Sequence, residues 1–398
     1  MQHIQQGVLL EKPRVSSIDI IRGLVMVIMV LDHVRHFMHA DALLYEPTEL
    51  SKTTPVLFFT RWITHFCAPA FVLLAGIASR ISSKRKSPAA LRTFLLTRGL
   101  WLLVLEVVVM RFSFTFNWYF DLIFFQVIWA IGASMIVLAA LIRFDEKFIL
   151  VISLIILFGH NALDPFSVNE SHPLYAPFTL LFKPGYIPLA NSGIMVMYPL
   201  VPWLGVFMLG YVLGKWFTAD FEKLRQPYLF ITGCAMVVLF VILRFTNFYG
   251  DPHGWEVQQN FTFTLLSFLN CEKYPPSLLY ILMTLGPVFI TLAVLDKIKT
   301  KVFNPLQTIG RVPLFFYIVH FFLIHIVALV IFMNQTGTSW SAIDFRATAT
   351  FGGITPGNGI SLPLVHLAWM GIVLVLFPLC WWYNRIKSRG KHWFFSYV

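Results

Sequence analysis

Residues 17–38 read SIDIIRGLVMVIMVLDHVRHFM, an apolar run that carries Asp, Arg and His side chains inside it. The run is long enough to cross the hydrocarbon core of a bilayer as one helix. Similar apolar runs follow along the whole chain, which is 58% hydrophobic, 16% aromatic and only 12% charged. Soluble globular domains carry about 25% charged residues. The composition therefore excludes a soluble protein and predicts an all-α, polytopic transmembrane helical bundle.

Hydropathy predicts about ten membrane spans. They cover residues 17–38, 55–79, 92–112, 119–141, 147–163, 195–214, 227–245, 276–295, 306–333 and 362–384. Residues 1–16 show no small-residue cleavage motif, so the first run is expected to remain as an uncleaved anchor. We expect one transmembrane domain over residues 17–384, with short tails at 1–16 and 385–398.

The basic residues of the loops predict the orientation. If the amino terminus is cytoplasmic, the outer loops hold only Lys52, Lys183, Lys273 and Arg346, and the other basic loop residues face the cytoplasm. The positive-inside rule then places both termini in the cytoplasm, and we expect an inner (cytoplasmic) membrane. The net charge of +11 follows from this topology. The expected partner is therefore the lipid bilayer and not nucleic acid.

Arginines inside the spans are functional candidates because a charge at such depth is costly. Arg22, Arg98 and Arg311 each lie five or six residues from the cytoplasmic end of a span, roughly 8 Å deep at 1.5 Å per residue. Guanidinium forks suit phosphate groups, which predicts a site for a polyphosphate ligand from the cytoplasm. Anchoring to lipid headgroups is the alternative. Near outer ends, snorkelling to headgroups is the expectation for Arg35, Arg111 and Arg244.

Histidines gather in the outer halves of the spans. Seven of them follow this pattern: His33, His36, His65, His160, His320, His325 and His366. Imidazole is the usual general base near neutral pH, so the pattern predicts a polar reaction chamber displaced toward the outside. The alternative is that each histidine is packed and satisfied. We assign four polar residues to substrate binding: His65, Arg61, His160 and His320.

The first span links the arginines to the histidines. Arg22 and His33 are 11 residues apart, which places both on one helix face about 16 Å from each other. This face suits an elongated donor held by its charged end, with its reactive end near the imidazole. Asp32 can reach His36 at i,i+4, so we predict that His33 is catalytic and that Asp32 and His36 assist it. The alternative is structural: Asp19 neutralises Arg22, and the histidines cap the helix end.

Several motifs resemble those of a known family. SIDIIRG (17–23) and MVLDH (29–33) resemble the first helix of the transmembrane acyltransferase superfamily, and the Arg-x10-His spacing is similar to that of its acyltransferase-3 group. The closer resemblance is to bacterial membrane proteins grouped with the catalytic domain of heparan-α-glucosaminide N-acetyltransferase. It is carried by WITHFCAPAFVLLAG (62–76), FQVIWAIG (125–132), GHNALD (159–164), YPLVPWLGVFMLGY (198–211), FLNCEKYPPSLLYILMTLGP (268–287) and IGRVPLFFYIVHFFLIH (309–325).

The resemblance implies an enzyme that moves an acyl group, typically acetyl, from cytoplasmic acyl-CoA to a sugar amine or hydroxyl on the outer side. Acetyl-CoA or another acyl-CoA is then the co-substrate, a glycan or amino sugar is the acceptor, and no metal is needed. Arg22, Arg98 and Arg311 would bind the donor phosphates. The competing function is a transporter or flippase whose buried charges form a permeation route. The sequence leaves the oligomeric state open, and a homodimer is one of the alternatives.

The catalytic histidine is not settled by the resemblance. The mammalian enzyme has an asparagine at the position matching His33, and its proposed catalytic histidine lies further on. His33, His36 and His39 therefore all stay candidates, and so do direct transfer and passage through an acyl-histidine.

Overall fold

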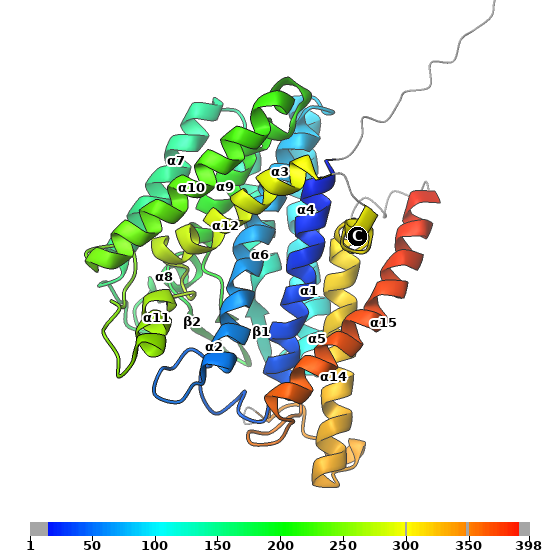
Figure 1. The fold of residues 1–398 in the computed structure, drawn as a ribbon. Coiled ribbons are helices and arrows are strands. Elements are labelled where there is room, and N and C mark those ends of the chain that lie inside the picture. The colour runs from blue at the N-terminus through cyan, green and yellow to red at the C-terminus, as the bar shows by residue number, and fades with distance from the viewer. Residues whose placement is uncertain (1–14, 299–300, 348–349, 390–398) are drawn as a thin grey trace, which may run out of the picture.

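The computed structural model describes residues 15–298, 301–347 and 350–389. Within them, eight helical segments are long and apolar enough to cross a membrane. Two further predicted spans correspond to α1 (Ser16–Met38), which carries four charged residues, and α6 (Val127–Leu141), which has only 15 residues. The helices run side by side as a bundle (Figure 1). The predicted all-α, polytopic class is confirmed.

The remaining elements follow in chain order. They are α2 (Pro55–Trp62), η1 (Ile63–Phe66), α3 (Cys67–Ser83), α4 (Pro88–Leu105), η2 (Glu106–Met110, a π-helical turn), α5 (Arg111–Thr115), β1 (Leu122–Phe125), α7 (Glu146–Gly159), η3 (His160–Leu163), α8 (Tyr175–Leu181), β2 (Gly185–Leu189), β3 (Ser192–Val196), α9 (Leu200–Leu213), η4 (Gly214–Phe217), η5 (Ala219–Phe221), α10 (Glu222–Thr246), α11 (Phe261–Leu269), α12 (Leu278–Lys297), η6 (Lys301–Phe303), α13 (Asn304–Gly310), α14 (Pro313–Thr336), η7 (Trp340–Ala342) and α15 (Leu362–Arg389).

A small sheet replaces helix at the start of two predicted spans. β3 pairs in parallel with β1 and antiparallel with β2, in the order β1-β3-β2. Helix over 119–126 and 195–199 is therefore wrong. A short apolar run such as 122–125 does not by itself distinguish strand from helix. Here the left-handed conformation of Phe116 ends α5 (φ 48°), and the strands pair across the outer loops.

The predicted span 306–333 is interrupted near its amino-terminal end. α13 ends at Gly310, and α14 starts at Pro313. Proline has no backbone N–H and disfavours helical geometry in the residue before it, which here is Val312 (φ −127°, ψ 51°). Arg311 thus lies at a helix break and not inside a continuous span, so its side chain can approach a neighbouring helix from the end of α13.

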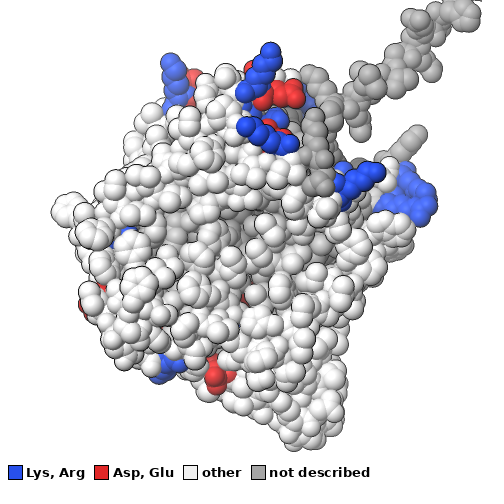
Figure 2. Space-filling model, viewed as in Figure 1, with Lys and Arg blue, Asp and Glu red and all other residues white. Residues whose placement is uncertain are grey.

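α1 is packed on several sides, by α3, α12, α13, α14 and α15. Its contact with α13 is very close, since a Cβ added at Gly23 or at Gly310 would collide with the backbone of the other helix. Small residues allow such approach between membrane helices. On the face drawn in Figure 2, charged residues gather near the two ends of the bundle and leave the middle almost free of charge. That distribution is typical of a bundle embedded in a bilayer.

Candidate active site

A pair of histidines from α1 and α14 forms the centre of the site. Nδ1 of His33 lies 2.8 Å from Nε2 of His320, and Nδ1 of His320 lies 3.1 Å from the carbonyl oxygen of Phe316. The carbonyl oxygen can only accept, so His320 donates from Nδ1 and accepts from His33 at Nε2. His33 therefore carries its proton on Nδ1, and its Nε2 keeps a lone pair.

His33 is the accessible member of this pair. His320 is fully buried, whereas His33 is half-buried, and its Nε2 has no hydrogen bond within the described part of the chain. Phe321 packs against the ring of His33 with 4.2 Å between centroids. A neutral imidazole held in one orientation by an acceptor at Nδ1 presents a basic nitrogen in a fixed direction, which is what general-base chemistry needs.

Asp32, next to His33, binds basic residues. Its carboxylate lies 2.6 Å from Nη1 of Arg61, 3.3 Å from Nη2 of Arg35 and 4.0 Å from Nζ of Lys273. The predicted pairing of Asp32 with His36 is therefore replaced by ion pairs, because a carboxylate gains more from a cation than from a neutral imidazole. Within the described residues neither ring nitrogen of His36 makes a hydrogen bond.

The three outer arginines expected to snorkel instead point inward. Arg35, Arg111 and Arg244 are 3%, 2% and 1% exposed. Arg111 donates to the carbonyl oxygen of Asn117 at 2.7 Å, and Arg244 donates to four backbone carbonyls. Loop carbonyls thus take the place of lipid headgroups for Arg111 and Arg244, and the carboxylate of Asp32 does so for Arg35. The expectation was wrong because these loops fold back over the helix ends.

Arg244 organises the loop that brings Lys273 into the site. It donates to the carbonyls of Phe268, Ser267 and Asn270, just before Lys273 in the chain. On the other side of Lys273, Ser277 caps α12. The loop is thereby held at both ends, and the side chain of Lys273 is 8% exposed. The topology prediction treated Lys273 only as an outer-loop charge, and hydropathy could not show that the loop turns inward.

Tyr274 accompanies Lys273 at the site. Its burial favours the neutral phenol, but the charges of Lys273 and Arg61 outweigh this and hold the pKa of Tyr274 below its ordinary value. Nζ of Lys273 lies 5.0 Å from the centroid of the Tyr274 ring. The site therefore has a positive side, formed by Arg35, Arg61 and Lys273, beside the neutral pair of His33 and His320.

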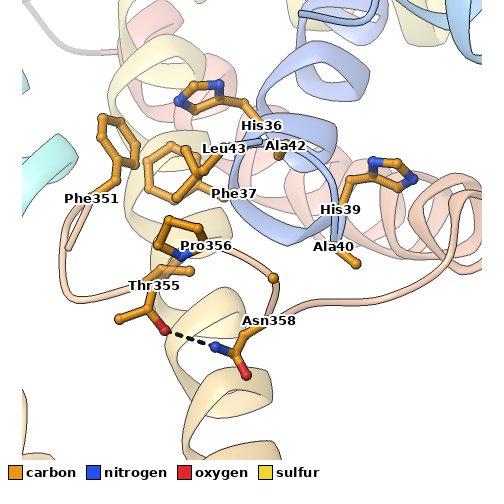
Figure 3. Close-up of a pocket in the computed structure, with 12 residues that line it drawn as sticks. His36, Phe37, His39, Ala40, Ala42, Leu43, Phe351, Thr355, Pro356 and Asn358 are labelled. Atoms are coloured by element: carbon orange, nitrogen blue, oxygen red, sulfur yellow. Dashed lines mark hydrogen bonds between the residues drawn. The ribbon is translucent and has the colours of Figure 1, made fainter. Parts of the chain in front are cut away.

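The outer end of α1 is closed by a glycine-rich loop, residues 351–360. Ala40 and Ile360 form a backbone hydrogen bond of 3.2 Å, which joins the loop to the chain after α1, where His39 lies buried. The hollow that remains between them is too narrow to admit a water molecule. Figure 3 shows His36 and Phe351 at one end of this hollow and Thr355, hydrogen-bonded to Asn358, at the other. The hollow is smaller than a typical ligand pocket, so the loop acts here as a cover over His36.

Two of the three predicted phosphate-binding arginines come together at the inner end of α1. Asp19 lies 3.2 Å from Nη1 of Arg22 and 3.8 Å from Nε of Arg311. Arg22 also donates to the carbonyl oxygen of Gly310 at 3.1 Å. The predicted i,i+3 pair of Asp19 and Arg22 is present. Arg98 lies half-buried on α4, whose main packing partner is α6, and its place in a shared phosphate site stays a prediction.

The other predicted substrate-binding residues lie in two settings. Arg61 and His65 lie in the Asp32 region, and Nδ1 of His65 is buried without a hydrogen-bond partner among the described residues. His160 instead faces two carbonyl oxygens, 2.9 Å from that of Ile156 and 2.8 Å from that of Pro276. This geometry joins η3 to the chain before α12, and the substrate-binding role of His160 stays a prediction.

The residues that could hold a cofactor are cationic ones. Arg22 and Arg311 offer guanidinium groups suited to phosphate. In the described residues no three His, Cys, Asp or Glu side chains meet in a way that could hold a metal ion. The arrangement therefore offers a fixed base, a positive side next to it, and a second cationic group about 16 Å away along α1.

Comparison with known proteins gives one finding. Residues 14–245 match the family model described as heparan-α-glucosaminide N-acetyltransferase, catalytic. The match covers more than half of the chain and includes α1 with His33 and Asp32, and α2 with Arg61. It ends before Lys273 and His320. No protein of curated function matches the chain.

Proposed function

The chain belongs to the heparan-α-glucosaminide N-acetyltransferase catalytic family, and from this premise we propose that it is an acyl-CoA-dependent acyltransferase of the inner membrane. It takes an acyl group, acetyl first of all, from acyl-CoA on the cytoplasmic side. The acceptor is the amine or hydroxyl of a sugar on the outer side. Membership of this family supports a transferase function in a membrane. The acyl donor, the acceptor and the direction of transfer are our proposal.

The hydrogen bond between His33 and His320 is the observation that carries this function. It holds the proton of His33 on Nδ1 and leaves Nε2 as a base at an accessible position. General-base removal of a proton from the acceptor contributes typically 10²–10⁴-fold to such reactions. We assign catalysis to His33, with His320 orienting it. Asp32 assists by holding the cations beside it, and His36 lies one turn further along α1.

The donor would lie along α1. Arg22 and Arg311 at the inner end would bind the phosphates of CoA, with Arg98 as a third group. The thioester would reach His33, about 16 Å further along the helix. The phosphates would contact the guanidinium groups of Arg22 and Arg311, whose planar geometry suits phosphate better than an ammonium group does. Arg61 and His65 remain the proposed acceptor-side contacts.

The test is acetyl transfer by the purified full-length protein in detergent or nanodiscs. We expect radiolabel from acetyl-CoA to reach glucosamine or, without acceptor, to be released by slow hydrolysis. His33→Ala should lower both rates by at least about 10²-fold. His366→Ala is the matched control, because His366 hydrogen-bonds Thr60, lies with it beside Leu31, and takes part in no step proposed here. Full activity of His33→Ala would remove His33 from the mechanism.

A further inference from the structure

We infer that Lys273, supported by Arg61, stabilises the oxyanion that forms on the thioester during acyl transfer. The inference rests on the proposed function and adds a residue from the outer loop to the reaction. It follows from an excess of positive charge beside His33, from buried polar atoms without partners, and from the place of this cluster along α1.

The charges around Asp32 are unbalanced. One carboxylate meets three cations, those of Arg35, Arg61 and Lys273. Glu46, which lies exposed in the loop after α1, acts on Arg35 and Arg61, and the phenol of Tyr274 also accepts a hydrogen bond from Arg61. Buried cations without matching anions are costly inside a bundle. Such an arrangement is stabilised when a ligand brings negative charge.

Hydrogen-bonding capacity is also unmet in this region. Nε of Arg35 and Nδ1 of His65 are buried and have no partner among the described residues. Buried polar atoms of this kind are uncommon, and a catalytic role is one of their explanations. Both residues are almost fully buried, at 3% exposed each. The charge and the unpartnered polar atoms therefore both indicate an anionic or strongly polar group in this region.

The position of Arg35, Arg61 and Lys273 along α1 indicates which part of the donor would bring the negative charge. Asp32 is adjacent to His33 in the chain, whereas Arg22 and the proposed phosphate site lie about 15 Å away along α1. The phosphates of the donor are at the end remote from its thioester. The group that reaches Lys273 is therefore the acyl end, which is neutral in the ground state and becomes charged only as the reaction proceeds. Preorganised cations at such a point favour the transition state over the substrate.

The step balances without a further reactant. The acceptor amine or hydroxyl loses a proton to Nε2 of His33, and its lone pair forms a bond to the thioester carbon. The C=O π electrons move to oxygen, and the resulting oxyanion lies against the ammonium group of Lys273. When the C=O bond forms again, the C–S bond breaks. The CoA thiolate then takes the proton from His33.

The experiment measures binding and does not depend on turnover. S-carboxymethyl-CoA places a carboxylate one bond beyond the carbon on which the oxyanion forms, and S-acetonyl-CoA places a neutral ketone at that same position; both carry the same phosphates. We expect the wild type to bind the carboxymethyl compound at least about 10-fold tighter by calorimetry. Lys273→Met should lose that preference while its Kd for the acetonyl compound stays within about 2-fold, and Lys273→Arg should retain it. Removing one such donor typically lowers kcat by about 10²–10³-fold.

Lys183→Met is the matched control, since Lys183 is an outer-loop lysine that donates to the carbonyl oxygen of Asp164 at 2.6 Å, away from His33. It should behave as the wild type. An unchanged preference in Lys273→Met overturns the inference, and so does equal weakening of both compounds, which would assign Lys273 to the phosphates or to folding. If neither compound binds the wild type, the acyl-CoA donor itself is wrong and the inference fails with it.

Discussion

Nδ1 of His33 and Nε2 of His320 lie 2.8 Å apart, although 287 residues separate them in the chain. This single contact sets which nitrogen of His33 is protonated. Because His320 is itself held by the carbonyl of Phe316, the tautomer is determined by a chain of two hydrogen bonds that ends on the backbone of α14.

The first prediction concerns His320. His320→Phe removes the acceptor for His33, so His33 can rotate or change tautomer, and kcat for acetyl transfer should fall by about 10²–10⁴-fold with little change in donor binding. His320→Gln keeps a side-chain oxygen as acceptor and should retain more activity than His320→Phe. Steady-state kinetics with a CoA-binding assay checks this. Equal activity of the two variants would show that the hydrogen bond has no catalytic role.

Glu106 is predicted to hold the start of α6. Its Oε1 accepts from the backbone N–H of Gln126 at 2.7 Å, and α6 has no capping side chain of its own. Glu106→Ala leaves a buried donor unsatisfied and should lower the free energy of unfolding by about 1–3 kcal/mol. Glu106→Gln retains a carbonyl acceptor and should cost less. Thermal unfolding in detergent compares them. A melting temperature of Glu106→Ala equal to that of the wild type contradicts the assignment.

The close contact of α1 with α13 gives a third prediction. A methyl group at Gly310 would meet the carbonyl of Asp19, so Gly310→Ala should push the helices apart and destabilise the protein by about 1–3 kcal/mol. It should also weaken CoA binding, because Arg311 follows Gly310. Gly371→Ala on α15 is the control, since nothing lies within 4 Å of a Cβ there. Loss of stability in both variants would mean that helix contact is not the reason.

The loop around Arg346 should respond to acid. Arg346 donates to both oxygens of Asp121, at 2.9 and 3.0 Å, and this hydrogen bonding with Arg346 lowers the pKa of Asp121. A carboxyl with a lowered folded-state pKa stabilises the fold above its unfolded pKa of about 3.9, and this contribution is lost as the pH falls through the lower folded value. As the pH falls through the folded-state pKa of Asp121, we expect residues 344–347 to lose protection from hydrogen exchange, after correction for the pH dependence of the intrinsic exchange rates. Asp121→Asn should remove the pH dependence, and its persistence in that variant would assign it to another group.

Much of the bundle could be predicted because its signals are local. Apolar runs identify the helices, and the 3.6-residue repeat places Arg22 and His33 on one face of α1. The pair of Asp19 and Arg22 follows from the same repeat. The strand at 122–125 and the break before Pro313 were missed, since a short apolar run or a single proline has more than one outcome until its neighbours are known.

The site itself depended more on contacts between distant segments. His320 was selected as a substrate contact, but its partnership with His33 needs α1 and α14 to pack at one register. Lys273 was read as a surface charge, because nothing near it in the chain shows that Arg244 folds the loop back. Arg35 was expected to reach lipid headgroups, although its partner Asp32 lies only three residues away on the same helix.

By itself, then, the amino-acid sequence determined a helical membrane protein, the order of its helices, and the spacing of Arg22 and His33, all of which depend on the covalent chain and the helix repeat. The tertiary structure alone decided which side chains meet: His33 with His320, and Asp32 with Arg61 and Lys273. The physical reason is that tautomer and ion-pair partners are set by distances of a few ångströms between segments far apart in the chain. Those distances arise only when the helices and the outer loops pack.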